Sequence, residues 1–204
     1  MSSQFWPEIS FYLREIEKEK EKLNMHQLKQ EQLEEMKKKV STFLEQLKTS
    51  LDRRLDPKDS SLVHFALIAS VDEDMQRFTH GQTTLEWAPL QKDFFGAYNA
   101  GELFYKSIDE ILENPKTPAI VFEVFYFSLK QGFKGKYKES KTQIAKYLEL
   151  LNDKIVKVAA QRHAEPETAP EKPPSRFKRK HYYSAAMVAS ILFFTLLYLN
   201  STLG

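Results

Sequence analysis

Three consecutive carboxylates, Asp72, Glu73 and Asp74, form the sharpest polar cluster in this sequence. Paired carboxylates can perform general acid–base chemistry when they converge on one substrate. The three follow directly on an apolar run that begins at Leu62, so we expect a helix to carry them. Because successive residues of a helix point about 100° apart, the three side chains diverge. The spacing therefore argues against an acid–base pair.

Two interpretations of this trio remain open. Arg77 lies three residues after Asp74 and four after Glu73, a spacing at which a cation compensates carboxylates on a helix. Alternatively, Asp72, Glu73 and Asp74 form an acidic patch that binds a basic surface of a partner.

Other sources of chemistry are absent from the sequence. It has no glycine-rich nucleotide loop, no zinc-protease motif and no serine-hydrolase motif. The five histidines are scattered, and we expect His64, within the apolar run, to be a hydrogen-bonded core or boundary residue. The absence of cysteine excludes disulfides and thiolate metal sites. We therefore expect no cofactor and no metal, and the net charge of +2 gives no argument for nucleic acid.

Two glycine-containing stretches stand out. Gly101 and Glu102 follow Asn99 within a helical pattern, where glycine costs about 1 kcal/mol relative to alanine. Close helix packing is the expected compensation. Residues 132–137, GFKGKY, indicate a helix end followed by a tight turn. Its surroundings are basic, through Lys130, Lys134, Lys136, Lys138 and Lys141. This turn is either a solvated loop or a contact for an acidic partner or anionic lipid headgroups.

The elements that must position these residues are helices. Apolar residues recur every three or four positions in 9–16, 33–55 and 144–158. The segments 62–71 and 118–129 are apolar almost all round, which is typical of buried helices. Asp56-Pro57 and Thr117-Pro118 each place a capping residue before a proline and predict helix starts. Trp87 lies in a loop between Gly81 and Pro89.

The C-terminal part carries the signature of a membrane anchor. Residues 182–199 contain no charge, and as a helix they would cover about 27 Å, close to the hydrocarbon thickness of a bilayer. The flank before them holds Arg176, Lys178, Arg179 and Lys180, which marks that side as cytoplasmic. We predict a cytoplasmic helical domain over 1–159, a Pro-rich then basic linker over 160–181, a transmembrane helix over 182–199 and a short periplasmic tail over 200–204.

Several motifs, taken in order, resemble one protein family. They are ALIASVDEDM at 66–75, Trp87, FFGAYNAGELFYKSIDEIL at 94–112 and EVFYFSLKQGFKGKY at 123–137. This succession is similar to the TssL/DotU family, also called IcmH, of bacterial type VI and type IVB secretion systems. The resemblance runs from about Leu62 to the end, and the N-terminal helices match only in character.

The resemblance implies an all-α fold of two packed three-helix-type bundles plus a single C-terminal transmembrane helix. It implies a non-enzymatic scaffold in the bacterial inner membrane, with a partner of the IcmF/TssM type and docked baseplate components. The family's Asp-Glu pair falls on Asp72 and Glu73, which favours the acidic patch as a partner-binding site. The other motif residues are expected to serve packing or docking: Trp87, Gly101, Glu102, Gly132, Phe133, Gly135 and Tyr137. The chain departs from the family in its long, charged N-terminal region, and we expect no periplasmic peptidoglycan-binding extension of the kind that some members carry.

Three alternatives stay open at this stage. The chain could serve a type IVB rather than a type VI system. It could be a tail-anchored coiled-coil protein that tethers or fuses membranes, although the prolines before the anchor interrupt the heptads that a zipper needs. A membrane-tethered enzyme is disfavoured by the lack of convergent polar groups. A homo-oligomer is also possible, through small residues in the membrane segment: Ser184, Ala185, Ala186, Ala189 and Ser190.

Overall fold

A helix-favouring composition and the positions of the prolines determine the secondary structure of this chain. The computed structural model describes residues 4–23, 28–81, 84–96 and 99–164. The elements in chain order are α1 (Trp6–Glu21), α2 (Gln30–Asp52), α3 (Pro57–Thr79), α4 (Leu90–Phe95), α5 (Ala100–Glu113), α6 (Ala119–Lys130), the short 3-10 helix η1 (Gly135–Tyr137) and α7 (Lys141–Ala164). No strand occurs in these ranges, so the all-α prediction is confirmed there.

Most predicted helix boundaries are confirmed, and two are corrected. Helix α3 begins at Pro57 directly after Asp56, as expected. Helix α6 begins one residue late, because Pro118 takes an extended conformation and is itself the N-cap. Helix α7 continues to Ala164, past the predicted start of the linker at residue 160. The reason is that the first helix-breaking residue in this stretch is Pro166.

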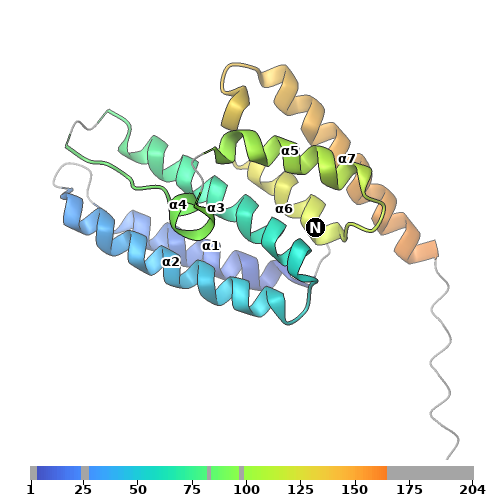
Figure 1. Ribbon diagram of the computed structural model, residues 1–204, viewed down its shortest axis with the longest axis horizontal. Coiled ribbons are helices and arrows are strands. Elements are labelled where there is room, and N and C mark those ends of the chain that lie inside the picture. The colour runs from blue at the N-terminus through green and yellow to red at the C-terminus, as the bar shows by residue number, and fades with distance from the viewer. Residues whose placement is uncertain (1–3, 24–27, 82–83, 97–98, 165–204) are drawn as a thin grey trace, which may run out of the picture. The chain divides into compact units, whose positions relative to one another are not determined.

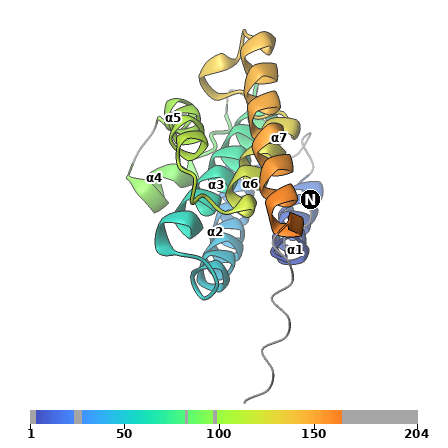
Figure 2. The same cartoon turned by 90° about the vertical axis from the view of Figure 1, so that its right-hand side faces the viewer.

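Helix α3 is the centre of the structure (Figures 1 and 2). Helices α1 and α2 form a hairpin, and α3 packs against α2 of this hairpin on one side and against α5 and α6 on the other. Residues 1–162 form one compact unit. Within this unit α3 contacts both sets of helices, and the division into two packed bundles stays a prediction.

The two helices predicted to be buried form the core. Leu67 and Ile68 of α3 and Phe122 and Phe125 of α6 are buried. The same core holds a carboxylate, because Glu123 of α6 is only 1% exposed. It accepts a hydrogen bond from the indole Nε1 of Trp6.

This bond spans most of the chain, and the Trp6 ring also lies 5.2 Å from the ring of Phe127. The start of α1 is therefore tied to the centre of α6 by both a polar and an aromatic contact.

The predicted anchor lies outside the described residues. The part that is not described includes the predicted membrane segment 182–199, the tail 200–204 and the basic flank of Arg176, Lys178, Arg179 and Lys180. Among the helices that are described, none has both the length and the apolar character to cross a bilayer.

His64 lies in the core between α3 and α4. Its side chain is 3% exposed, and its ring stands edge-on to Phe94 at 5.1 Å and near Phe95 at 6.0 Å. Burial, with a smaller contribution from the nearby charge of Lys48, lowers the pKa of His64 to about 4. Its Nε2 atom has no hydrogen-bond partner in the described part of the chain, and the backbone of Leu44 and the charge of Asp52 offset the fall in pKa only in part.

This burial predicts a pH-dependent stability. The pKa of a histidine in the unfolded chain is about 6.5, so the unfolded state binds more protons than the folded state between pH 4 and 6.5. The contribution of His64 is fully present above that range and is lost as the pH falls through it. We expect a loss of about 2 kcal/mol between pH 8 and pH 5.

Urea unfolding of the wild type and of His64→Leu at both pH values measures this loss. The variant should show a much weaker pH dependence, whereas His80→Leu, at an exposed histidine, should behave like the wild type. Equal pH dependence in all three proteins would contradict the assignment.

Candidate docking cleft

Asp72 is a structural acceptor inside the fold. Its side chain is 1% exposed. One carboxylate oxygen, Oδ1, accepts hydrogen bonds from Trp87 Nε1 at 2.8 Å and from the backbone N–H of Leu90 at 2.7 Å. The other, Oδ2, accepts the N–H of Gln91 at 2.8 Å. Burial raises the pKa of Asp72, and these three donors oppose the rise because they favour the ionised form. Asp72 thus holds the Trp87 loop and the start of α4 against α3.

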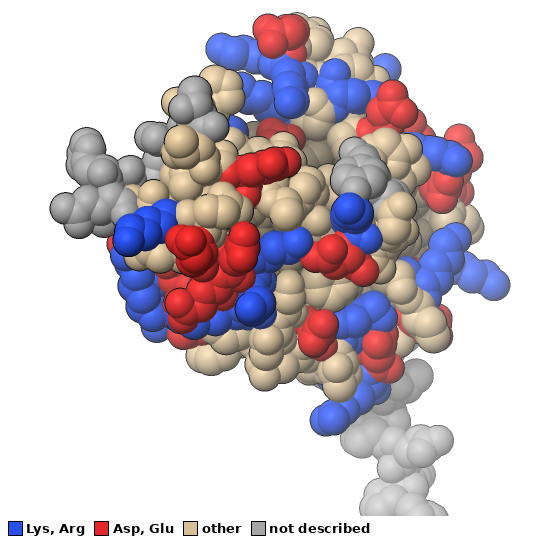
Figure 3. All heavy atoms as spheres, turned by 60° about the vertical axis from the view of Figure 1, so that its left-hand side comes forward, with Lys and Arg blue, Asp and Glu red and all other residues tan. Residues whose placement is uncertain are grey.

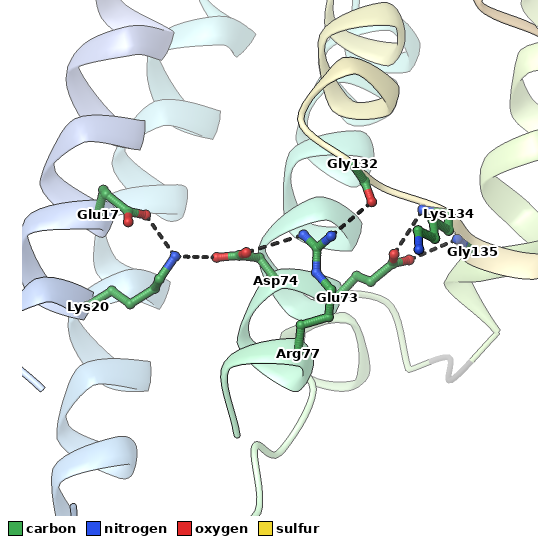
Figure 4. A network of polar contacts seen from close by, with 8 residues as sticks. All are labelled: Glu17, Lys20, Glu73, Asp74, Arg77, Gly132, Lys134 and Gly135. Carbon is green, nitrogen blue, oxygen red and sulfur yellow. Dashed lines mark hydrogen bonds and ion pairs between the residues drawn. The ribbon is translucent and has the colours of Figure 1, made fainter. Parts of the chain in front are cut away.

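Glu73 performs a similar task at a different place. Its two carboxylate oxygens accept the backbone N–H groups of Lys134 and Gly135, each at 2.8 Å. These donors belong to the segment 132–137, which we call the GFKGKY turn. Figure 4 shows Glu73 reaching from α3 to this turn. The turn is therefore fastened to α3 by a carboxylate that is 61 residues away in sequence.

The GFKGKY turn begins as a regular helix end. Gly132 has φ +98, its N–H donates to the carbonyl of Leu129, and the N–H of Phe133 donates to the carbonyl of Ser128. This pair of bonds is the Schellman motif, which usually requires glycine at the left-handed position. The predicted helix cap followed by a tight turn is thus confirmed.

Aromatic side chains pack the GFKGKY turn against α5. Phe133 is buried, with its ring 4.1 Å from that of Phe104. Tyr137 packs edge-on against Tyr105 at 4.5 Å, and the Tyr105 hydroxyl donates to the carbonyl of Lys134 at 2.9 Å. The turn is an ordered part of the fold, although its lysines at 134 and 136, and Lys138 directly after it, remain exposed.

Gly101 and Gly135 bring two backbones into direct contact. A Cβ at Gly101 would lie 3.2 Å from the backbone of Gly135. A Cβ at Gly135, where φ is +51, would lie 2.8 Å from the carbonyl oxygen of Gly101. The expected close packing at Gly101 is confirmed, and its partner is the GFKGKY turn rather than one of the long helices.

Asp74 points away from both of these sites. Its carboxylate pairs with Lys20 of α1 at 2.7 Å and with Arg77 at 3.2 Å, and Arg77 also donates to the carbonyl of Gly132 at 3.0 Å (Figure 4). Compensation by Arg77 is thus confirmed for Asp74. For Glu73 no bond to Arg77 is found, because its carboxylate faces the turn.

A single acidic patch over these three residues is a wrong prediction, because Asp72 is buried and the three carboxylates face different elements. On the face drawn in Figure 3, acidic and basic side chains are interspersed. Whether Glu73 or Asp74 also contacts a partner stays a prediction.

The motif residues instead gather around one cleft between α3, α5 and the GFKGKY turn. This docking cleft has a volume of about 430 Å³. Six of the residues singled out in the sequence line it: Asp72, Glu73, Gly101, Glu102, Phe133 and Gly135. Asp74, Trp87, Gly132 and Tyr137 do not line it. In the described part of the chain, no group of three acidic or histidine side chains is arranged to hold a metal ion.

Only some of the charged side chains that line the docking cleft form bonds within the fold. Glu73 is bonded to neutral backbone groups, and among the described residues no ion pair is formed by its carboxylate. Glu102 is exposed, and its side chain makes no hydrogen bond or ion pair with the described residues. Lys136 and Lys138 line the other wall. The cleft is thus lined by both carboxylates and amines.

Several contributors to this region were not predicted. Gln91 is 8% exposed, and its Oε1 accepts the N–H of Ala100 at the start of α5. Tyr105 and Lys20 supply the contacts described above. Each acts on a residue that is distant in sequence, and periodicity carries no signal for such a bond. The first N–H groups of a helix have no acceptor within the helix. This general need at the start of α5 is the only signal that could have suggested the role of Gln91.

A family model described as "Type VI secretion system protein DotU" matches residues 21–203 of the chain. The chain belongs to the DotU family. The match extends well before Leu62, so α2 belongs to the family domain although its motifs did not indicate this. The matched range also includes the predicted membrane segment 182–199. No curated protein matches the chain.

Solved structures of DotU and TssL proteins share the fold. A structure of DotU from Francisella novicida has a TM-score of 0.64 at 19% identity and covers 74% of this chain and 99% of its own. The cytoplasmic domain of TssL from Acinetobacter baumannii has a TM-score of 0.63 at 19% identity, covering 77% and 99%. SciP/TssL from enteroaggregative Escherichia coli 042 has a TM-score of 0.55 at 22% identity, covering 74% and 84%.

Proposed function

We propose that this DotU-family chain is a non-enzymatic scaffold subunit in the membrane complex of a type VI secretion system. Residues 182–199 would anchor it in the bacterial inner membrane, with the helical domain in the cytoplasm. The family description names the type VI system, and this favours it over the type IVB alternative.

In this proposal the docking cleft receives a partner. The convergence of six motif residues on one cleft is the observation that supports it. Most of them are committed to holding the cleft in shape, through the bonds of Asp72 and Glu73 and the crossing of Gly101 and Gly135. The Glu102 side chain bonds to none of the other described residues, so it is available to a partner. The partners that fit are a protein of the IcmF/TssM type and cytoplasmic baseplate components, presenting a basic side chain to Glu102 and Glu73.

Charge reversal at Glu102 tests this role without disturbing the fold. Reversing Asp72 or Glu73 would break hydrogen bonds inside the domain, so those variants cannot separate docking from folding. Glu102→Lys should reduce recovery of the partner about ten-fold, because one ion pair is lost and a like-charge contact is created. The measurement is a pull-down from detergent-solubilised host membranes with an N-terminally tagged full chain, followed by mass spectrometry.

Glu110→Lys is the matched control, since Glu110 is exposed on the same helix but outside the cleft. It should recover the partner at the wild-type level, and all three proteins should be found in the membrane pellet. Full partner recovery with Glu102→Lys would count against the docking cleft. Recovery of vesicle-tethering factors instead would count against the scaffold itself.

A further inference from the structure

A second concave surface runs along α1, and the ion pairs that Asp74 forms with Lys20 and Arg77 lie on its rim. It is a groove of about 510 Å³ between α1, α3 and α6, and it shares only Phe133 with the docking cleft. Its wall on α1 extends from Ser10 to Lys20, about 15 Å along the helix axis. We call it the α1 groove.

The α1 groove is held open by contacts at both ends. At one end, Trp6 bonds to Glu123 and packs on Phe127, which also lines the groove. At the other end, Lys20 pairs with Asp74 at 2.7 Å. Between these two ties α1 packs mainly on α2 rather than on α3 or α6, so a trench remains beneath it.

The lining is apolar with a charged rim. Leu13 and Phe127 provide the partly exposed apolar surface, and the buried side chains of Ile16, Val71 and Met75 form its base. Such a surface is suited to the side chains of an amphipathic helix, which anchor in grooves of this kind at i, i+4 and i+7.

The rim carries one unbalanced positive charge. Five charged side chains line the groove, and four of them are joined to one another: Glu17 with Lys20 at 3.0 Å, Lys20 with Asp74, and Asp74 with Arg77 at 3.2 Å (Figure 4). The fifth, Arg14, is exposed and makes no ion pair or hydrogen bond with the described residues. Its planar guanidinium is suited to bidentate binding of a carboxylate.

We propose that the α1 groove binds an acidic amphipathic helix of a partner protein. Apolar side chains of that helix occupy the trench, and an aspartate or glutamate beside them pairs with Arg14. This surface is distinct from the docking cleft, so the domain holds two partner segments at once. The inference does not depend on which protein uses the cleft.

A displayed library of helix-forming peptides, about 15 residues long, tests the proposal against the full-length protein in detergent. The selected peptides should carry apolar residues at i, i+4 and i+7 with an adjacent Asp or Glu. Fluorescence anisotropy should then show about ten-fold weaker binding to Arg14→Glu and to Ser10→Trp, which places a bulky ring over the groove.

Arg53→Glu is the matched control, because it makes the same charge reversal at an exposed arginine outside the groove. It should bind like the wild type, and circular dichroism should show all variants folded. Selection of no peptide, selection of basic peptides, or binding that ignores Ser10→Trp would overturn the proposal. Binding that is lost with Ser10→Trp but unchanged with Arg14→Glu would overturn the acidic partner.

Discussion

Replacing Asp72 by alanine should lower the free energy of unfolding by about 4 kcal/mol. The change removes the acceptor of three donors, Trp87 Nε1 and the N–H groups of Leu90 and Gln91, at a residue that is only 1% exposed. Each unsatisfied buried donor costs about 1 to 3 kcal/mol, and relaxation of the Trp87 loop recovers part of this. Urea unfolding followed by circular dichroism measures the loss, and the near-ultraviolet signal of Trp87 should weaken.

Asp74→Ala is the matched control two residues later. Asp74 is 42% exposed and its ion pairs with Lys20 and Arg77 face solvent, so its loss should cost about 1 kcal/mol or less. Asp72→Asn should fall between the two alanine variants, because its amide keeps one accepting oxygen. If Asp72→Ala were no more damaging than Asp74→Ala, the structural role of Asp72 would be refuted.

Gly135→Ala should cost about 3 kcal/mol. At φ +51 an L-residue is strained by about 1 to 2 kcal/mol, and here the new Cβ also meets the Gly101 carbonyl oxygen at 2.8 Å. Since that oxygen belongs to the backbone of α5, the turn or the helix must shift. The displacement should loosen the bonds from Glu73, and hydrogen exchange at the amides of Lys134 and Gly135 should become faster.

Gly96→Ala separates strain from crowding. Gly96 has φ +65, but a Cβ there would have nothing within 4 Å. Its alanine variant should therefore lose only the strain term, about 1 kcal/mol. The difference between the two variants gives the cost of separating the backbones of Gly101 and Gly135. Similar losses in both would mean that the close approach adds no stability constraint.

The helices were predictable because their signals are local. The stripe from Leu33 to Leu55 and the prolines at 57 and 118 specify a helix and two helix starts within a few residues of the correct bounds. The end of α7 was misplaced because residues 160–164 show no apolar periodicity, although they are compatible with a helix and lie before the first proline at 166.

The candidate site was predictable only in part. Six motif residues line one cleft that the sequence did not predict, and for the trio at 72–74 the sequence left a shared acidic surface and compensation by Arg77 both open. Sequence spacing gave the divergence of the three side chains but not what each one meets. The bond between Trp6 and Glu123 shows the difficulty most clearly: a carboxylate in an apolar helix becomes tolerable only through a partner 117 residues away.

The divergence of Asp72, Glu73 and Asp74 has a consequence for insertions and deletions. Each carboxylate serves a different neighbour: the Trp87 loop, the GFKGKY turn and α1. One residue added or removed within this stretch would rotate everything after it by about 100° relative to everything before it. Every carboxylate beyond that point would then face a neighbour meant for another. Substitutions at these three positions have effects that range from mild to severe. A change of length instead breaks several attachments together, so the number of residues in this part of α3 is constrained.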